Sequence, residues 1–211
     1  MCSRKMSTMS SDAILLMQVW PGGPFEQMVE MQRQRNMDYC KAHNFDLEIL
    51  VGTLSPKYAD FNVGSWVKVE QMIAALKKGY KYIVSLEPDT LIKDTSADLR
   101  EGCPRGVGAC YHRHPVGHQW NVGALYMQNS PEAMAFMEEW LAEWPAEPLW
   151  RDNGAFNVVA MRNHTAQTIS DRWNATLDCS MVPDAVVLGF HGVGINANAR
   201  LETMKKVLAQ I

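Results

Sequence analysis

The sequence lacks any apolar run of about 18 residues, the length that a membrane-spanning helix needs. It also lacks a charge excess of either sign, because 20 Lys and Arg stand against 23 Asp and Glu, a formal net charge of −3. No membrane insertion is therefore expected, and a polyanionic partner has no direct support from the charge balance.

Cysteine pairs, repeats and common catalytic signatures are missing as well. The five cysteines are odd in number and no two have CxxC spacing, so we expect free thiols, a reducing compartment and a cytoplasmic protein. No internal repeat, Walker phosphate loop or Ser-His-Asp signature occurs. Nucleotide hydrolysis by a P-loop and triad hydrolysis are therefore excluded.

What is present is an ordinary globular composition of 211 residues, 47% of them hydrophobic. Residues 1–11 are polar and predict a flexible tail, and 12–211 predict a single domain. Apolar patterns predict strands at 12–20, 45–51, 80–86, 107–111, 124–128 and 185–190, and helices at 24–43, 65–78, 130–144, 153–162 and 201–211, with a loop at 52–64. Strands and helices alternate in the first half, which predicts an α/β fold whose mostly parallel sheet is flanked by helices.

Two carboxylates, Glu87 and Asp89, follow the apolar strand 82–86 directly. Ligands of open α/β sheets bind at the carboxyl ends of the strands. Carboxylates in that place suit Mg²⁺ or Mn²⁺, which take one or two acidic ligands and fill the rest with water and substrate phosphates. The alternative is an acidic turn that only ends the strand.

His191 also follows an apolar strand, and we expect it at the same sheet edge as Asp89, completing a metal site with Glu87. Imidazole beside carboxylates favours Mn²⁺. The glycines around it, Gly192 among them, allow a phosphate to approach the backbone. The alternative is a histidine with a purely structural role.

Three further residues offer polar side chains in breaks between apolar segments. Asn121, in Trp-Asn-Val-Gly, offers an amide to a sugar hydroxyl or is an ordinary turn residue. Asp152 and Asn153 lie in a polar break between Trp150 and Phe156, and Asp152 directly precedes the expected helix, so it is a sugar ligand, a base or a helix N-cap. The histidines at 112, 114 and 118 have no Cys or acid at ligand spacing beside them, so we expect a solvated loop rather than a zinc site.

Seven segments, in this order, resemble the GT-A nucleotide-sugar glycosyltransferases, namely the glycogenin-like and the yeast-type α-galactosyl and mannosyl transferase families. They are residues 36–45, Trp66-Val67-Lys68, residues 82–89 in the place of an Asp-x-Asp strand, 120–125, 152–157, Arg172-Trp173-Asn174 and Phe190-His191-Gly192. The resemblance covers about residues 12–194. It implies a single-domain GT-A, Rossmann-like fold.

The resemblance also implies the chemistry: metal-dependent transfer of a sugar from a nucleoside-diphosphate sugar, with a UDP-sugar favoured, to an acceptor hydroxyl, with retention of configuration. Asp89, His191 and Glu87 would hold Mn²⁺ or Mg²⁺, and Glu87, Asp89, Lys68 and Gly192 would contact the donor. Asn121, Asp152 and Asn153 would line the sugar pocket. If the enzyme inverts, Asp152 is the candidate base.

The sequence departs from these families at three points. Glu87 replaces the first Asp of the metal motif, and Asn153 replaces a Gln. A Lys-Pro-Trp segment after His191 is missing, so Arg200, Lys68 or Arg113 would have to supply the cationic contact to the diphosphate.

Two other functions stay open. A sugar-phosphate nucleotidyltransferase should carry a basic, Gly-rich loop after the first strand, and residues 20–24 contain no basic residue. A catalytically inactive nucleotide-sugar-binding module is the other alternative. The acceptor is open among a saccharide, a protein, a lipid head group and a hydroxylated base in DNA.

Overall fold

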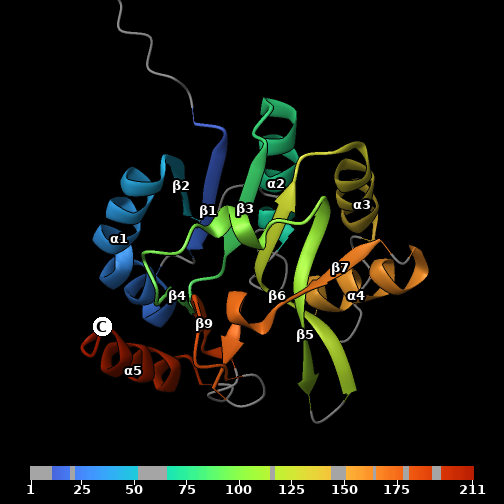
Figure 1. Cartoon of the computed structure of the whole chain (residues 1–211). Helices are drawn as coiled ribbons and strands as arrows, with labels where there is room; N and C mark the ends of the chain where they lie inside the picture. Colours follow the sequence, from blue (N-terminus) through green and yellow to red (C-terminus); the bar gives the residue numbers. More distant parts are fainter. Residues whose placement is uncertain are drawn as a thin grey trace, which may run out of the picture.

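The apolar segments of the sequence assemble into one main sheet. The computed structural model describes residues 11–19, 22–51, 66–114, 117–143, 151–163, 165–177, 181–191 and 196–211. Their main sheet has six strands in the order β2-β1-β3-β6-β5-β7, and β6 alone runs against the common direction of the other strands (Figure 1). The predicted mostly parallel sheet is thereby confirmed.

A smaller, three-stranded sheet with the order β4-β9-β8 lies beside it. The elements, in chain order, are β1 (Ala13–Val19), α1 (Gly23–His43), β2 (Phe45–Val51), α2 (Val67–Lys78), β3 (Tyr82–Leu86), β4 (Thr90–Ile92), the 3-10 helix η3 (Leu99–Gly102), β5 (Gly106–His114), β6 (Gly117–Gln128), α3 (Pro131–Ala142), α4 (Arg151–Asn163), β7 (Ala166–Ile169), the 3-10 helix η4 (Asp171–Trp173), β8 (Ala175–Thr176), β9 (Val187–Gly189) and α5 (Ala197–Leu208).

Local sequence signals set the helix ends. Asn44 and Gly79 end α1 and α2 in the left-handed conformation, with φ values of 54° and 90°, which these residue types tolerate best. The hydroxyl of Ser130 accepts the N–H of Ala133 at 3.1 Å and caps α3, whose first residue is Pro131. These caps fix where the chain turns back toward the sheet.

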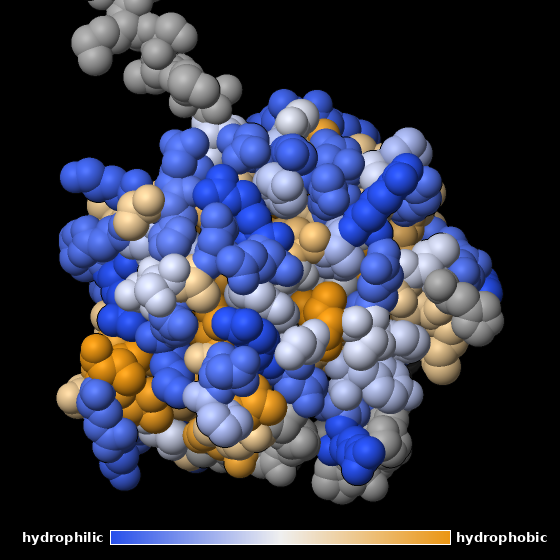
Figure 2. All heavy atoms as spheres, viewed as in Figure 1, coloured by the Kyte–Doolittle hydropathy of each residue, from blue (hydrophilic) through white to orange (hydrophobic). Residues whose placement is uncertain are grey.

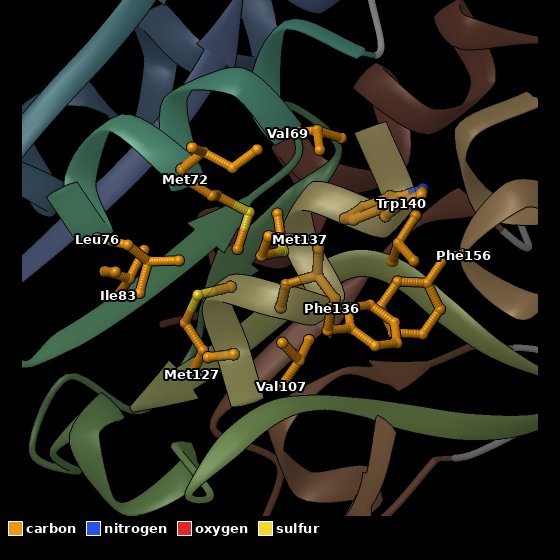
Figure 3. Packing of buried hydrophobic residues seen from close by; sticks show 14 of the residues in the cluster. Val69, Met72, Leu76, Ile83, Val107, Met127, Phe136, Met137, Trp140 and Phe156 are labelled. Atoms are coloured by element: carbon orange, nitrogen blue, oxygen red, sulfur yellow. The ribbon is translucent and has the colours of Figure 1, made fainter. Parts of the chain in front are cut away.

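Helices α2, α3 and α4 cover one face of the main sheet. Their buried apolar side chains interlock with those of the strands in one cluster, shown in Figure 3, which includes Met72, Ile83, Met127, Trp140 and Phe156. The Trp and Met stripe of α3 is thus core, as aromatic side chains at helical spacing usually are.

Helix α1, the small sheet and α5 cover the other face. Tyr39 of α1, Tyr126 of β6 and Trp173 of η4 belong to the cluster on that face, and a third cluster joins Met28 of α1 to Phe190 and to Leu201 of α5. The C-terminal helix is therefore anchored beside β4 and β9 (Figure 1). Figure 2 shows that the side in view is mainly hydrophilic, with separate small apolar areas.

Several element boundaries differ from the predictions. The strands expected at 107–111 and 124–128 extend to 106–114 and 117–128, because the two pair as a long hairpin. Strands β4, β7 and β8 were not predicted, α4 begins at Arg151, and α5 begins at Ala197. Ser11, assigned to the tail, is buried, whereas residues 1–10 and the expected loop 52–64 lie outside the described residues. Among the described helices, none has the length and apolarity needed to cross a membrane.

Candidate functional site

Two acidic residues follow the end of β3 in the main sheet. The N–H of Glu87 still donates to the carbonyl of Gly123 in β6, at 2.8 Å, before the chain turns. Helix α1 holds this turn, because Nε2 of the buried Gln32 donates to the carbonyl of Pro88 at 3.2 Å. Glu87 and Asp89 are therefore fixed at the carboxyl end of a central strand.

A buried lysine joins the acidic turn to α4. Nζ of Lys68, in α2, lies 2.5 Å from Oε1 of Glu87 and 2.7 Å from Oδ2 of Asp152, and the Lys68 side chain is 2% exposed. Burial by itself lowers the pKa of Lys68, but the carboxylates of Asp152 and Glu87 outweigh it and raise that pKa. The ammonium group therefore stays charged between its two partners.

For Glu87, burial outweighs the opposing charge of Lys68, and its pKa is raised. Burial raises its pKa, Lys68 opposes this rise, and the neighbouring carboxylates of Asp152 and Asp89 add to it. The single positive charge of Lys68 is thus shared by more carboxylates than it can neutralise. The site has a local excess of negative charge in which a further cation is favourable.

Polar side chains of α4 cover the part of β6 that extends beyond β3. Asn157 bonds both backbone groups of Trp120, each at 2.9 Å. Oδ1 of Asn153 accepts the N–H of Val122 at 2.9 Å. These bonds replace a missing strand partner, and they bring Asp152, in the first turn of α4, to the acidic turn. Because α4 begins at Arg151, two residues earlier than predicted, Asp152 lies inside the helix rather than at its N-cap.

Asn121 lies within β6 and is not the turn residue that the sequence offered as an alternative. Its Oδ1 accepts the N–H of Gly123 and an N–H of the buried Asn174, both at 2.9 Å. Its Nδ2 lies 2.8 Å from Nε2 of His191. Asn121 is therefore the link between the hairpin and the segment after β9.

Asp89 and His191 come together through the small sheet. Strand β4, which starts just after Asp89, pairs antiparallel with β9, and the N–H of Phe190 donates to the carbonyl of Asp89 at 2.9 Å. The sequence argument placed both residues at the carboxyl edge of one sheet, which is wrong. An antiparallel pair instead sets the start of one strand beside the end of the other.

Arg200 of α5 forms an ion pair with Asp89. Its Nη1 lies 2.7 Å from Oδ2 of Asp89, and the two side chains are 19% and 3% exposed. Of the cations proposed for the diphosphate, Lys68 is held between two carboxylates and Arg113 lies exposed on the β5–β6 hairpin. Arg200 is the one that pairs with Asp89 and keeps part of its side chain exposed.

Three polar side chains of the site converge on the backbone of Gly123. A Cβ at this position would lie 2.9 Å from Oδ1 of Asn121, 3.6 Å from Nδ1 of His191 and 3.7 Å from Oε2 of Glu87. Only glycine therefore allows Asn121 to approach the backbone of β6 this closely. Any larger residue at 123 would crowd the oxygen of Asn121.

His112 corrects another expectation, because it lies in β5 and is buried, not in a solvated loop. Its ring stacks on that of His191, with centroids 5.9 Å apart and planes at 18°. Ligand atoms of Cys110, His112 and Asp171 lie within 4.8 Å of one another. The sequence argument that no Cys or acid accompanies this histidine was therefore wrong, since Cys110 stands two residues away and η4 brings Asp171.

Glu87, Asp89 and His191, the three predicted metal ligands, do not form a group of this kind. Over the described part of the chain, Cys110, His112 and Asp171 are the three His, Cys, Asp or Glu residues whose ligand atoms lie close enough together to hold one ion. Glu87 and Asp89 remain two carboxylates on one turn, a donor set that suits a divalent cation completed by phosphate oxygens. Their role as metal ligands, and that of His191, stays a prediction.

Two residues of the site were not among the predicted site residues. Asn174 appeared only in the Trp-Asn segment of the resemblance, and Gln32 gave no signal, since a helical glutamine is ordinary in sequence. Gly192, a predicted donor contact, lies outside the described residues.

Comparisons with known proteins give a family and a fold for this chain. A profile of a family described as nucleotide-diphospho-sugar transferase matches residues 26–209. A search of curated proteins finds no significant match.

Three solved structures are similar in fold. A glycosyltransferase involved in the glycosylation of the major capsid of PBCV-1 has 13% identity and a TM-score of 0.72, over 92% of this chain and 98% of that one. Mouse xyloside xylosyltransferase 1 has 12% identity and a TM-score of 0.51, over 85% and 97%. The bifunctional glycosyltransferase WbbM has 10% identity and a TM-score of 0.51, over 96% of this chain and 52% of that one.

Proposed function

The chain belongs to the nucleotide-diphospho-sugar transferase family and is a nucleotide-sugar glycosyltransferase of GT-A fold, and we propose that it binds its donor at the side chains gathered around Gly123. The observation that carries this proposal is that two bonded groups of polar side chains meet there. Lys68, Asp152 and Glu87 are joined by ion pairs, Asn121 and His191 lie within hydrogen-bond distance, and Glu87, Asn121 and His191 all approach Gly123.

Arg200 is proposed as the cationic contact of the diphosphate. Its guanidinium is already at the acidic turn, and its planar fork suits phosphate oxygens. Lys68 takes a different role: it is a positioning residue that holds Glu87 and Asp152 at a fixed separation.

A divalent cation, Mn²⁺ or Mg²⁺, fits the carboxylates of Glu87 and Asp89. Asp89 would bind it directly and Glu87 directly or through water, and the bound cation would neutralise charge on the leaving diphosphate. The excess of acid over cationic side chains around Glu87 supports this assignment.

Asn121, Asp152 and Asn153 are proposed to face the sugar, and the reaction is proposed to retain configuration. Asp152 forms a buried ion pair with Lys68 through Oδ2. We therefore assign Asp152 to hold a sugar hydroxyl rather than to act as the base that inversion needs.

The described cysteines Cys40, Cys103 and Cys110 are free thiols. This supports the proposal of a reducing compartment, the cytoplasm, because secreted domains of this size commonly carry disulfides.

The test is a thermal-shift screen of UDP-, GDP- and dTDP-sugars with and without Mn²⁺. A donor at 100 times its Kd stabilises the fold by about 2.7 kcal/mol, which raises the Tm of a chain of this size by roughly 5–10 °C. The positive donor is then incubated with mixed acceptors, and release of the nucleoside diphosphate is measured. If no nucleotide sugar raises the Tm, or if the bound donor is never cleaved, the proposal is wrong.

EDTA should reduce both the shift and the turnover, and added Mn²⁺ should restore them. Full turnover in EDTA would remove the metal from the proposal while leaving the donor in place.

A further inference from the structure

A hydrogen-bond chain that starts at a backbone amide fixes the orientation of the Asn121 side chain. The N–H of Gly123 donates to Oδ1 of Asn121 at 2.9 Å. A backbone N–H can only donate, so the atom facing it must be the amide oxygen. Nδ2 of Asn174 reaches the same oxygen at 2.9 Å, and the amide nitrogen of Asn121 therefore points away from both.

That amide nitrogen points at the imidazole of His191. The distance from Nδ2 of Asn121 to Nε2 of His191 is 2.8 Å. An amide nitrogen has donors only, so Nε2 accepts and carries no proton, and the proton of a neutral imidazole must then be on Nδ1. A doubly protonated ring would set an N–H against the Asn121 amide.

The ring position is fixed from a second direction. His112 stacks on His191 with a centroid distance of 5.9 Å and nearly parallel planes. Nδ1 lies 3.6 Å from the point where a Cβ of Gly123 would be, and Oε2 of Glu87 lies 3.7 Å from the same point, so Nδ1 is on the side of the ring toward Glu87. The protonated nitrogen is thus the one that faces the proposed donor site.

We propose that His191 acts as a neutral Nδ1–H donor to a phosphate oxygen of the bound donor and is not a metal ligand. A metal needs a nitrogen lone pair: that of Nε2 is engaged by Asn121, and Nδ1 carries the proton. The tautomer follows from the structure alone, whereas the phosphate as its partner rests on the proposed function.

The tautomer is tested by NMR on protein labelled with ¹⁵N in its six histidine rings. The signals of His191 are assigned by their loss in His191→Asn. We expect a pyrrole-type Nδ1 and a pyridine-type Nε2 near neutral pH. The reverse pattern, or a doubly protonated ring, would overturn the proposal.

A matched pair of variants tests the role. In His191→Asn the amide reaches the former Nδ1 position, and in His191→Gln it reaches the former Nε2 position. Affinities for UDP, for pyrophosphate and for Mn²⁺ alone are measured by calorimetry and by electron paramagnetic resonance.

We expect His191→Gln to bind UDP and pyrophosphate about 10-fold or more weakly, since a hydrogen bond to a charged group is lost. His191→Asn should stay within about fivefold of the parent protein, and neither variant should change Mn²⁺ affinity. Weaker Mn²⁺ binding in either variant, or better retention by Gln than by Asn, would overturn the proposal.

The proposed donor site and the proposed His191 tautomer can be refuted independently. If the parent protein binds neither UDP nor pyrophosphate, the donor assignment and with it the phosphate partner are wrong. The NMR measurement needs no ligand and still decides the tautomer, also if the variants do not fold.

Discussion

Replacing Lys68 by Met tests the positioning role that the structure gives to its ammonium group. Met keeps the aliphatic length of the side chain but removes the cation shared by Glu87 and Asp152. The lysine side chain is 2% exposed and that of Asp152 is 9% exposed, so little water can replace the lost contact. Removing one partner of a buried ion pair costs about 3–5 kcal/mol, because the other charge remains buried without compensation.

The assay is urea unfolding at pH 7, followed by circular dichroism, with Lys77→Met as the control. Lys77 lies on the same helix, its side chain is 64% exposed, and its Nζ is 3.9 Å from Glu138. An exposed pair of this kind contributes at most about 1 kcal/mol. The double variant Lys68→Met with Asp152→Asn should recover part of the loss, since it removes one of the uncompensated carboxylates.

The pH dependence has a definite sign. Burial raises the pKa of Glu87 and Lys68 opposes that rise, so without Lys68 the pKa of Glu87 in the folded state lies further above its unfolded value. The folded variant then binds more protons than the unfolded chain between those values, so its stability falls as pH rises. The deficit against the parent protein should be larger at pH 7 than at pH 4.5. A Lys68→Met protein as stable as Lys77→Met, or a double variant with purely additive loss, would refute the reasoning.

Two further predictions concern acids. Asp89→Asn should fold and lose about 10³-fold in turnover, roughly 4 kcal/mol of transition-state stabilisation. The control Asp184→Asn changes a side chain that is 67% exposed and should keep its rate. Equal rates of the two variants in steady-state assays would remove Asp89 from the site. Burial raises the pKa of Asp98, but hydrogen bonds from Arg100 outweigh this effect and lower the pKa. The stabilising contribution of Asp98 is therefore present above about pH 4 and is lost as pH falls through the lowered value. Acid titration of Asp98→Asn should show a smaller loss of stability below pH 4 than the parent protein, and identical titration curves would contradict this.

The fold could be predicted where one local pattern decided the structure. The apolar strand 82–86, the Pro-Glu opening of α3 and the Gly79 stop of α2 are determined by residues adjacent in sequence. Strands β4 and β8, of three and two residues, carry no such signal. They exist because β9 lies between them and supplies their hydrogen bonds, a contact that separation in sequence hides.

The candidate site could likewise be predicted only where residues adjacent in sequence define it. Glu87 and Asp89 are visible in sequence because they follow an apolar strand. Their pairing with Lys68 and Arg200 is not visible, because Lys68 lies 19 residues before Glu87 and Arg200 lies 111 residues after Asp89. Neither distance has a motif, and each contact depends on where a helix packs on the sheet.

Prediction of Asn121 and His191 as site residues came from types of side chain, and types cannot say which atom points where. Their roles depend on the backbone N–H of Gly123, which is present at every non-proline position and so leaves no trace in sequence. Only the folded hairpin sets this N–H against the oxygen of Asn121 and turns the amide nitrogen toward the ring. The protonated face of His191 is therefore a consequence of the backbone path of β6, and a sequence with the same Asn and His on another path would present the opposite nitrogen.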